Sequence, residues 1–368
     1  MASITWSQAL AWRQRQQLLD PIGTEPVEDV VRRLGAVQAQ QGSAAELSIR
    51  LRRARSHSGE VAEARADGRL IMTFAFRGAT HLMTPEDGGI YLALRMANRQ
   101  WELRDWQTYY KLAPSDWPAL REVVRAALAD GPLTVKELVA AIAASPKFGH
   151  LGPILAVNPK GVMKVLGWHG EMSFGPFRGK QATFQRLDGN PRWAGIPDLD
   201  EAGMRAVEAY FRTYGPATSG RLQYWLGNGL SAGKKRIEGW IADFGDRLAE
   251  IDVDGESALV LRDDLDDLAG AQRSTTVRLL PAYDQWVFGP GTADDHIVPA
   301  AHRTLVTRGA NLVLVGGVVS GAWSLDGDEV AIDWFRESGS PPGDRLAEEI
   351  GRLATILDRP LRMTIRSS

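Results

Sequence analysis

The sequence predicts an α+β protein built from three tandem winged-helix repeats, followed by a C-terminal β-rich region. Two observations indicate the repeats: a helix, helix, helix and β-hairpin order in residues 117–188, and the same order again in residues 199–262. A third observation, strand-like stretches after residue 273, indicates the β-rich region. The expected domains are residues 1–112, 113–192, 193–270 and 271–368.

The second repeat is the clearest of the three. WPALREVVRAALAD, GPLTVKELVAAI and NPKGVMKVLGWHG have the apolar spacing of helices, and Asn158 with Pro159 is expected to begin the third. EMSFGPFRGKQATFQRL is typical of two strands around a GPFRGK turn. The third repeat shares the junction Gly-Pro-x-Thr-x-x-x-Leu (GPLTVKEL at 131–138, GPATSGRL at 215–222), whose threonine can cap the second helix.

The third repeat continues with strands expected near RLAEIDV and SALVLRD. The first repeat is more degenerate, with helices expected near residues 5–19, 26–35 and 44–55 and strands near LIMTFAF and ATHLMTP. Basic residues recur on the third helix of each repeat: arginines in the first, Lys160 and Lys164 in the second, and Lys234, Lys235 and Arg236 in the third.

The C-terminal region is expected to be mostly strands. VRLLPAYDQWVF, ANLVLVGG, VVSGAWSL and EVAIDWF have strand patterns, and a helix near 342–358 precedes a last strand, LRMTIRS. Gly316-Gly317 is a strong two-residue signal for a hairpin turn.

Composition restricts the class of protein. The 368 residues are 44% hydrophobic and 24% charged, as in an ordinary globular protein. No apolar run is long enough to span a bilayer and the N-terminal stretch is too polar for a secretory signal, so we expect a cytoplasmic protein. The absence of cysteine excludes disulfides and thiolate nucleophiles.

The net charge of −2 hides an asymmetry between the two halves of the chain. Residues 1–180 hold 23 Lys and Arg against 17 Asp and Glu, whereas residues 181–368 hold 20 against 28. A basic surface can therefore bind phosphate although the whole chain is slightly acidic.

Motifs for several other activities are absent. There is no HExxH, GxGxxG or GxxxxGK[ST]. DDHIVPAAH at 294–302 has metal-ligand types, but a structural loop is the favoured interpretation, and we expect no metal site and no cofactor. The twelve tryptophans are expected to fill cores rather than stack on bases.

The stretch AVQAQ places Gln38 and Gln40 directly before a basic helix. The i,i+2 spacing points both side chains the same way if the segment is extended. In the helix, Arg50, Arg52 and Arg53 lie where a winged helix has its recognition helix. Two interpretations stay open: a solvated basic face, or contact with DNA phosphates.

The motifs AVQAQ with SAAELSIRLR, FRGATHLM, LLPAYD and VLVGGVVSGAW occur in the order seen in the AlkZ-like and YcaQ-like bacterial DNA glycosylases, which this sequence resembles over nearly its whole length. The resemblance implies tandem winged helices and a catalytic Gln-apolar-Gln motif, here Gln38 and Gln40. It also implies that the partner is double-stranded DNA with alkylated purines, and that the protein is linked to resistance against alkylating natural products. We expect a monomer. One departure is Val318, where family members often have arginine in the hairpin.

The chemistry of the amide pair agrees with this resemblance. A guanine alkylated at N7 is already cationic and departs as a neutral base, so no general acid is needed. Two neutral amides can hold a water against C1′ and place carbonyl dipoles near the developing positive charge.

The favoured function is thus a monofunctional glycosylase for bulky N7-alkylguanine adducts, with interstrand cross-links among the candidate substrates. The alternative is a non-catalytic winged-helix regulator or a drug-sequestering resistance protein, since fold alone does not separate them. The expected DNA contacts are Arg50, Arg52, Arg53, Arg77, Thr80, His81 and the hairpin residues Gly316, Gly317 and Val318.

Overall fold

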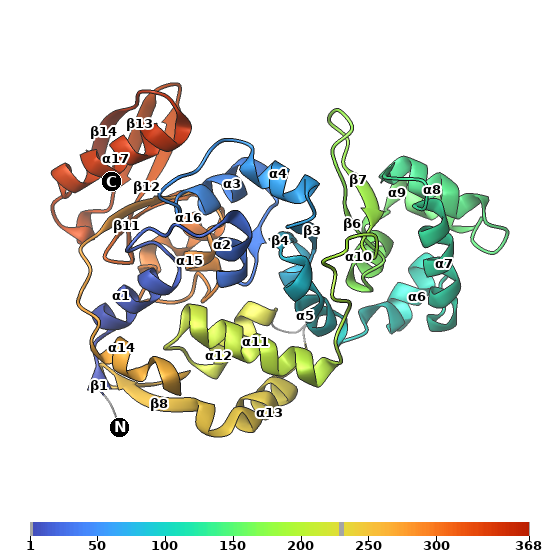
Figure 1. The fold of residues 1–368 in the computed structure, drawn as a ribbon, viewed down its shortest axis with the longest axis horizontal. Coiled ribbons are helices and arrows are strands. Elements are labelled where there is room, and N and C mark those ends of the chain that lie inside the picture. The colour runs from blue at the N-terminus through green and yellow to red at the C-terminus, as the bar shows by residue number, and fades with distance from the viewer. Residues whose placement is uncertain (1–2, 228–231, 368) are drawn as a thin grey trace. The chain divides into compact units, whose positions relative to one another are not determined.

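The computed structural model describes residues 3–227 and 232–367 of the chain (Figure 1). Contacts between residues divide the chain into two compact units. We call Met1–Ala62, Val207–Trp225 and Ile241–Ser368 the terminal unit, and Glu63–Ala206 with Leu226–Trp240 the central unit.

The central unit contains the second predicted repeat. Its elements are β3 (Ile71–Phe74), β4 (Thr80–Met83), α5 (Pro85–Met96), α6 (Arg104–Tyr110), α7 (Trp117–Ala127), β5 (Leu133–Thr134), α8 (Val135–Ala144), α9 (Leu151–Val157), α10 (Lys160–Trp168), β6 (Met172–Phe174) and β7 (Thr183–Arg186). β3 and β4 form one antiparallel hairpin, and β5, β7 and β6 form a three-stranded sheet in that order.

The helices and hairpin predicted for the second repeat are confirmed as α7, α8, α10 and the β6–β7 hairpin. Thr134 caps α8 as predicted, because its hydroxyl accepts from the backbone N–H of Glu137 while the Glu137 carboxylate accepts from Thr134. The cap predicted at Asn158 is wrong: Pro159 occupies the N-cap position of α10, with no side-chain cap bond. The short helix α9 is an addition that the sequence pattern did not indicate.

The terminal unit holds both ends of the chain. Its elements are β1 (Ser3–Ile4), α1 (Trp6–Gln16), α2 (Val27–Arg33), β2 (Val37–Gln38), α3 (Gly42–Arg50), β8 (Leu248–Val253), β9 (Glu256–Leu261), α14 (Leu265–Ala269), β10 (Val277–Leu280), α15 (Gln285–Phe288), α16 (Arg303–Thr307), β11 (Asn311–Val315), β12 (Val318–Asp326), β13 (Glu329–Trp334), α17 (Gly343–Leu357) and β14 (Arg362–Ser367). Helix α4 (Glu60–Ala66) leads from this unit into the central one.

The third predicted repeat is also found as a sequence of elements. α11 (Leu199–Tyr214), α12 (Ser219–Leu226) and α13 (Lys234–Phe244) precede the antiparallel pair β8 and β9. The Thr218 hydroxyl accepts from the Arg221 backbone N–H at 3.3 Å, which confirms the predicted cap of α12. β1 adds to β8 in parallel.

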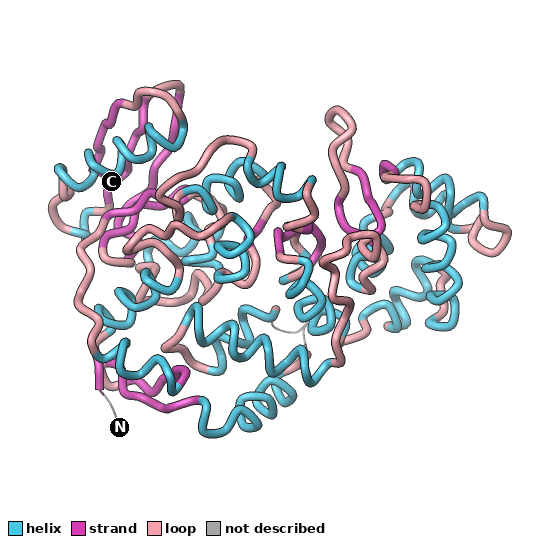
Figure 2. Tube along the Cα trace, viewed as in Figure 1, coloured by secondary structure: helices cyan, strands magenta, loops and turns pink. Residues whose placement is uncertain are grey.

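The C-terminal region forms a five-stranded sheet in the order β10-β11-β12-β13-β14, in which the β13–β14 pair is parallel and the other three pairs are antiparallel. Figure 2 draws the strands in magenta. The Gly316-Gly317 turn between β11 and β12 is confirmed, with φ of 56° and 91° at the two glycines. The expectation of a single strand over VRLLPAYDQWVF is wrong. β10 ends at Leu280, and α15 begins at Gln285, where the Asp284 side chain accepts from the Trp286 N–H and caps the helix.

Apolar side chains from distant regions of the sequence build the terminal unit. One cluster joins α1 to α15 and the β11–β12 hairpin through Leu10, Trp286 and Leu314, and another packs α17 against the sheet through Leu346, Ile350 and Leu353. Nine of the twelve tryptophans are buried, which confirms that most of them fill cores.

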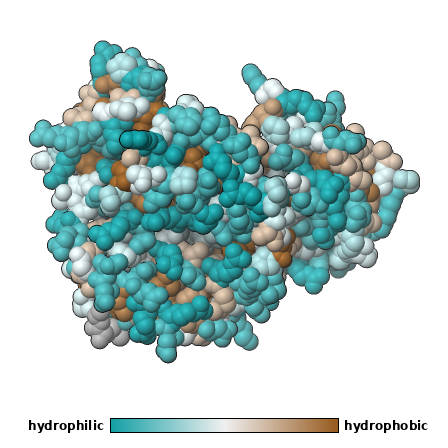
Figure 3. Space-filling model, viewed as in Figure 1, coloured by the Kyte–Doolittle hydropathy of each residue, from teal (hydrophilic) through white to brown (hydrophobic). Residues whose placement is uncertain are grey.

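Two surface properties follow from composition. Every lysine of the sequence lies between residues 111 and 235 and belongs to the central unit, so the basic side chains of the terminal unit are arginines rather than lysines. The face drawn in Figure 3 is mostly hydrophilic with scattered apolar patches. Within the described residues, no helix combines the length and apolar character needed to cross a bilayer.

Candidate active site

Gln38 and Gln40 are in direct contact at the start of α3. Val37 and Gln38 form the short strand β2, and the Gln38 Nε2 donates to the Gln40 Oε1 at 3.2 Å. The two side chains therefore point the same way, as the i,i+2 spacing predicted. Gln38 is half-buried and Gln40 is exposed, while Ala36 and Val37 are buried and anchor the segment.

The hydrogen bond between the amides leaves each glutamine with further capacity. An amide has two donors and two acceptor lone pairs, and this bond uses one donor of Gln38 and one acceptor site of Gln40. The Gln38 Oε1 and the Gln40 Nε2 take no part in it. A carbonyl dipole and an N–H donor can thus face a substrate from adjacent positions without a net charge.

Helix α3 follows the pair immediately and is held by a buried polar cluster. Its first residue is Gly42 and its N-cap, Gln41, makes no side-chain cap bond. Near the other end, the Ser48 hydroxyl donates to Asp284 Oδ2 at 2.5 Å. Arg52 donates to both carboxylate oxygens of Asp284, at 2.8 and 2.7 Å. The LLPAYD motif thus supplies the carboxylate that fixes the helix following the glutamines.

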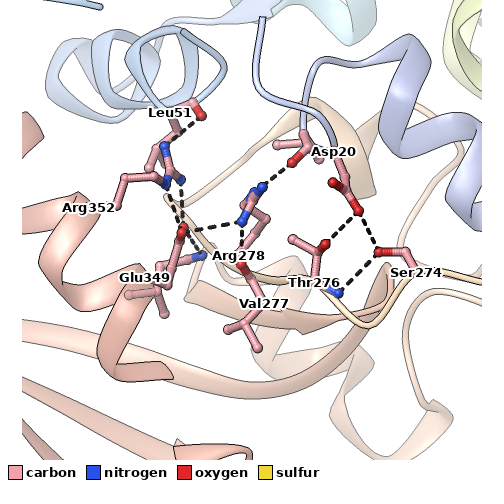
Figure 4. A network of polar contacts seen from close by, with 10 residues as sticks. Asp20, Leu51, Ser274, Thr276, Val277, Arg278, Glu349 and Arg352 are labelled. Carbon is pink, nitrogen blue, oxygen red and sulfur yellow. Dashed lines mark hydrogen bonds and ion pairs between the residues drawn. The ribbon is translucent and has the colours of Figure 1, made fainter. Parts of the chain in front are cut away.

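A second network reaches the C-terminal end of α3 from α17 (Figure 4). The buried Glu349 carboxylate accepts from Arg352 at 2.6 and 2.8 Å, and from the Leu279 backbone N–H at 3.1 Å. Arg352 then donates to the Leu51 carbonyl at 3.0 Å. The orientation of α3, and of the glutamines at its start, is therefore tied to the C-terminal sheet.

These contacts correct the prediction made for Arg50 at the end of α3 and for Arg52 and Arg53 just after it. Arg52 is completely buried against Asp284, so its predicted contact with DNA phosphate is wrong. Arg50 is also buried, with hydrogen bonds to the Ile356 carbonyl and the Ser56 hydroxyl. Arg53 pairs with Glu60 and donates to the Glu25 carbonyl. The solvated-face alternative does not describe Arg50 and Arg52 either, because both side chains are buried.

The three DNA contacts predicted in and beside the β3–β4 turn of the central unit lie in different environments. His81 is buried, its Nδ1 lies 3.0 Å from the Ala79 carbonyl, and burial lowers its pKa to about 3. A neutral, buried imidazole does not contact phosphate, so this prediction is wrong. Arg77 is exposed at the turn with a φ of 51°, and Thr80 is half-buried. Both stay predictions.

The Gly316-Gly317 turn packs into its own unit. The Gly317 carbonyl accepts from Trp286 Nε1 at 2.9 Å, and a Cβ at Gly317 would lie 2.9 Å from the Trp286 ring. Gly317 is buried and unavailable to a duplex, which contradicts its predicted contact. Gly316 and Val318 are half-buried and line a hollow of about 260 Å³.

Two arginines that the sequence patterns did not single out line the same hollow. Arg273 and Arg345 are exposed there, beside Trp6 and Val318. Positive charge therefore lies beside the β11–β12 hairpin, although Val318 stands in the hairpin where family members often have arginine. No sequence motif marks Arg273 or Arg345, because they come from a loop and from α17.

The side chains of DDHIVPAAH have separate partners. Asp294 is buried and lies 3.7 Å from Arg13, and Asp295 pairs with Arg303. His302 contacts Glu337, while His296 lies 3.3 Å from Glu256 and stacks on Trp6. Each of these four side chains thus has a protein partner of its own.

Comparison with known proteins decides the family. The family model for AlkZ-like DNA glycosylases matches residues 31–356. The chain belongs to the AlkZ-like DNA glycosylase family. This AlkZ-like protein is 34% identical over 356 residues, covering 95% of its chain and 96% of the relative, to the interstrand DNA cross-link repair glycosylase of Streptomyces sahachiroi.

The fold agrees over the same length. The solved structure of Streptomyces sahachiroi DNA glycosylase AlkZ matches with a TM-score of 0.92 at 33% identity, over 99% of this chain and all of that chain. The α+β class and the glycosylase activity predicted from the motifs are therefore confirmed, and DNA is the substrate polymer. The non-catalytic alternative is not supported.

Proposed function

We propose that this AlkZ-like protein excises bulky N7-alkylguanine adducts with Gln38 and Gln40 as its catalytic pair. The observation that carries the proposal is the 3.2 Å contact between the two amides at the start of an anchored helix. Neither amide titrates near neutral pH, so the pair suits a leaving group that needs no proton.

The proposed step balances without an added acid. The N-glycosidic bond breaks and its electron pair neutralises the cationic N7-alkylguanine, which departs as a neutral base. Water adds to C1′ of the sugar and its proton passes to solvent. The amides hold that water and set a carbonyl dipole against the positive charge on the sugar.

The protein is proposed to be monofunctional, because a lyase step needs an amine that forms a Schiff base with the sugar. The terminal unit, which holds both glutamines, contains no lysine between residues 3 and 62 or in its two later segments. The reaction then stops at an abasic site.

The inclusion of interstrand cross-links among the substrates is supported by the similarity to the interstrand DNA cross-link repair glycosylase of Streptomyces sahachiroi. We propose that the protein acts on duplex DNA as a monomer in the bacterial cytoplasm, and that it protects against alkylating genotoxins. Arg77, Thr80, Val318 and Gly316 remain proposed DNA contacts, and Arg273 and Arg345 join them because they line the hollow beside the hairpin.

The test is base release from duplex DNA that carries N7-methylguanine. The wild type should liberate free N7-methylguanine and leave an uncleaved abasic strand, whereas Q38A, Q40A and the double variant should release it far more slowly. Q41A is the matched control, since Gln41 is the exposed next glutamine and makes no side-chain cap bond. Undiminished release by the double variant would overturn the assignment.

A further inference from the structure

The hairpin of the second repeat presents an aromatic side chain to solvent. The segment between β6 and β7 projects as a narrow loop with the sequence GPFRGK near its tip (Figure 1). Phe177 in this loop is 59% exposed, whereas the other nine phenylalanines of the sequence are buried or half-buried. Phe174 and Phe184, on the two strands of the hairpin, contact each other with tilted rings at 4.8 Å between ring centroids.

The loop that carries Phe177 is ordered by its own contacts. Backbone hydrogen bonds in both directions join Arg178 and Gln181, at 2.9 and 3.2 Å. The buried Thr183 hydroxyl donates to the Pro176 carbonyl at 2.6 Å. The aromatic ring is therefore exposed from a constrained position, which lowers the entropy lost when a partner covers it.

Arg178 fixes the loop to the rest of the repeat. Its guanidinium donates to both carboxylate oxygens of Glu137, at 2.7 and 3.0 Å, and to the Pro132 carbonyl at 2.7 Å. Glu137 is the capping residue of α8. The residue next to Phe177 thus links the hairpin tip to the start of α8, the second helix of the repeat.

The charge around the tip indicates which partner covers the ring. Residues 172–186 contain no acidic side chain, and Lys180 is exposed three positions after Phe177. An exposed aromatic wedge beside a cation is the combination with which proteins enter the minor groove and unstack adjacent base pairs. A protein of the DNA glycosylase family has DNA as its substrate, so the substrate duplex is the partner that this chemistry fits.

We propose that Phe177 inserts into the minor groove of the substrate duplex, with Lys180 on the adjacent phosphate. The wedge anchors the central unit on DNA, and Phe177 is a positioning residue rather than a catalytic one. The proposal rests on membership of the DNA glycosylase family and is independent of the role given to Gln38 and Gln40.

The first test is binding of F177A to an undamaged duplex and to the same duplex with N7-methylguanine, followed by fluorescence anisotropy. Both affinities should fall at least about fivefold, the lower limit for loss of one aromatic contact with a base. F177L should retain most of the affinity, because leucine also serves as a wedge. V157A is the matched control, since Val157 is 83% exposed in the same unit.

The second test separates a wedge from a general surface contact. A duplex with 2-aminopurine should brighten when wild-type protein unstacks the probe, and F177A should abolish that signal. K180A should keep the signal and lower the slope of log affinity against log salt by about 0.9. Single-turnover base release at saturating F177A should match the wild type. Unchanged affinity of F177A, or an unchanged 2-aminopurine signal, would overturn the proposal, as would a loss confined to the rate of base release. An unchanged melting temperature of F177A and F177L shows that the fold is intact.

Discussion

Arg52 and Asp284 form a two-pronged ion pair, with both side chains completely buried and 232 positions apart in the sequence. The pair joins the helix after the glutamines to the LLPAYD motif. Removal of one partner leaves an uncompensated buried charge, which costs about 3–5 kcal/mol. R52A and D284A should therefore each lower the melting temperature sharply, and differential scanning calorimetry measures the change. R55A, at an exposed arginine nearby, should leave the melting temperature unaltered. Equal melting temperatures for R52A and R55A would contradict the structural role.

The catalytic assignment makes a prediction about pH. Because amides do not titrate near neutrality and the cationic base needs no proton, the rate of N7-methylguanine release by wild-type protein should be flat from about pH 6 to pH 8. Single-turnover rates across this range test it, with Q41A as a control that should give the same flat profile. A bell-shaped profile that persists in Q41A would show that a titrating group takes part and would redirect the search away from the amide pair.

The buried His81 predicts how stability depends on pH. Burial lowers the pKa of His81 from 6.5 to about 3. Between these two pH values, His81 is therefore protonated in the unfolded chain and neutral in the folded chain. The free energy of unfolding should therefore be at its full value above about pH 6.5 and fall as the pH drops, by up to about 1.4 kcal/mol per pH unit. Burial also lowers the pKa of His169, to about 4, which adds a contribution of the same sign.

Comparison of H81Q with the wild type isolates the first of these contributions. Thermal unfolding at several pH values from about 7 down to about 5 should show a shallower decline for H81Q. H57Q, at a histidine whose side chain is 63% exposed, is the control and should decline as the wild type does. If stability declines with pH in parallel for all three proteins, protonation of His81 does not lower the free energy of unfolding.

The Gly316-Gly317 turn predicts a steric effect at one glycine. Gly317 has a φ of 91° and its missing Cβ would press on the Trp286 ring, so G317A should destabilise by about 1–3 kcal/mol from strain and overpacking. G327A is the matched control, because Gly327 has a φ of 52° in the next hairpin but open space around its Cβ position. The loss of stability in chemical denaturation should be larger for G317A; a larger loss for G327A would mean that the turn is not packed on Trp286.

Arg77 is exposed in the β3–β4 turn and is a proposed DNA contact. Loss of one phosphate contact lowers the slope of log affinity against log salt by about 0.9, so R77A should bind duplex DNA more weakly and with a flatter salt dependence. R77K keeps the charge and should retain most of the slope. If R77A binds DNA with the wild-type slope, Arg77 is not a phosphate contact.

The local features of the fold could be predicted from the sequence, because they depend on neighbouring residues. Thr134 and Thr218 cap their helices, the two glycines form a turn, and Gln38 meets Gln40, all as spacing and residue type indicate. The same patterns place α10 correctly but give it a cap at Asn158 that Pro159 takes instead.

The fate of the basic residues could not be predicted in this way. Arginine is normally a surface residue, and nothing near Arg52 in the sequence announces a carboxylate from the LLPAYD motif. Arg50 likewise ends on the Ile356 carbonyl of α17, and His81 is covered within the core of its own unit. Long-range packing decided each of these cases, so the charged side chains that looked most suited to DNA are largely structural.

The distribution of lysine has a practical consequence for experiments on this enzyme. A protease specific for lysine has its first site at residue 111 and its last at residue 235, so residues 1–111 and 236–368 each survive complete digestion as one fragment. Amine-reactive fluorophores and cross-linkers likewise attach their side-chain labels only to the central unit. Footprinting of these lysines, with and without duplex, thus maps contacts of one unit while the unit with Gln38 and Gln40 keeps its side chains unmodified.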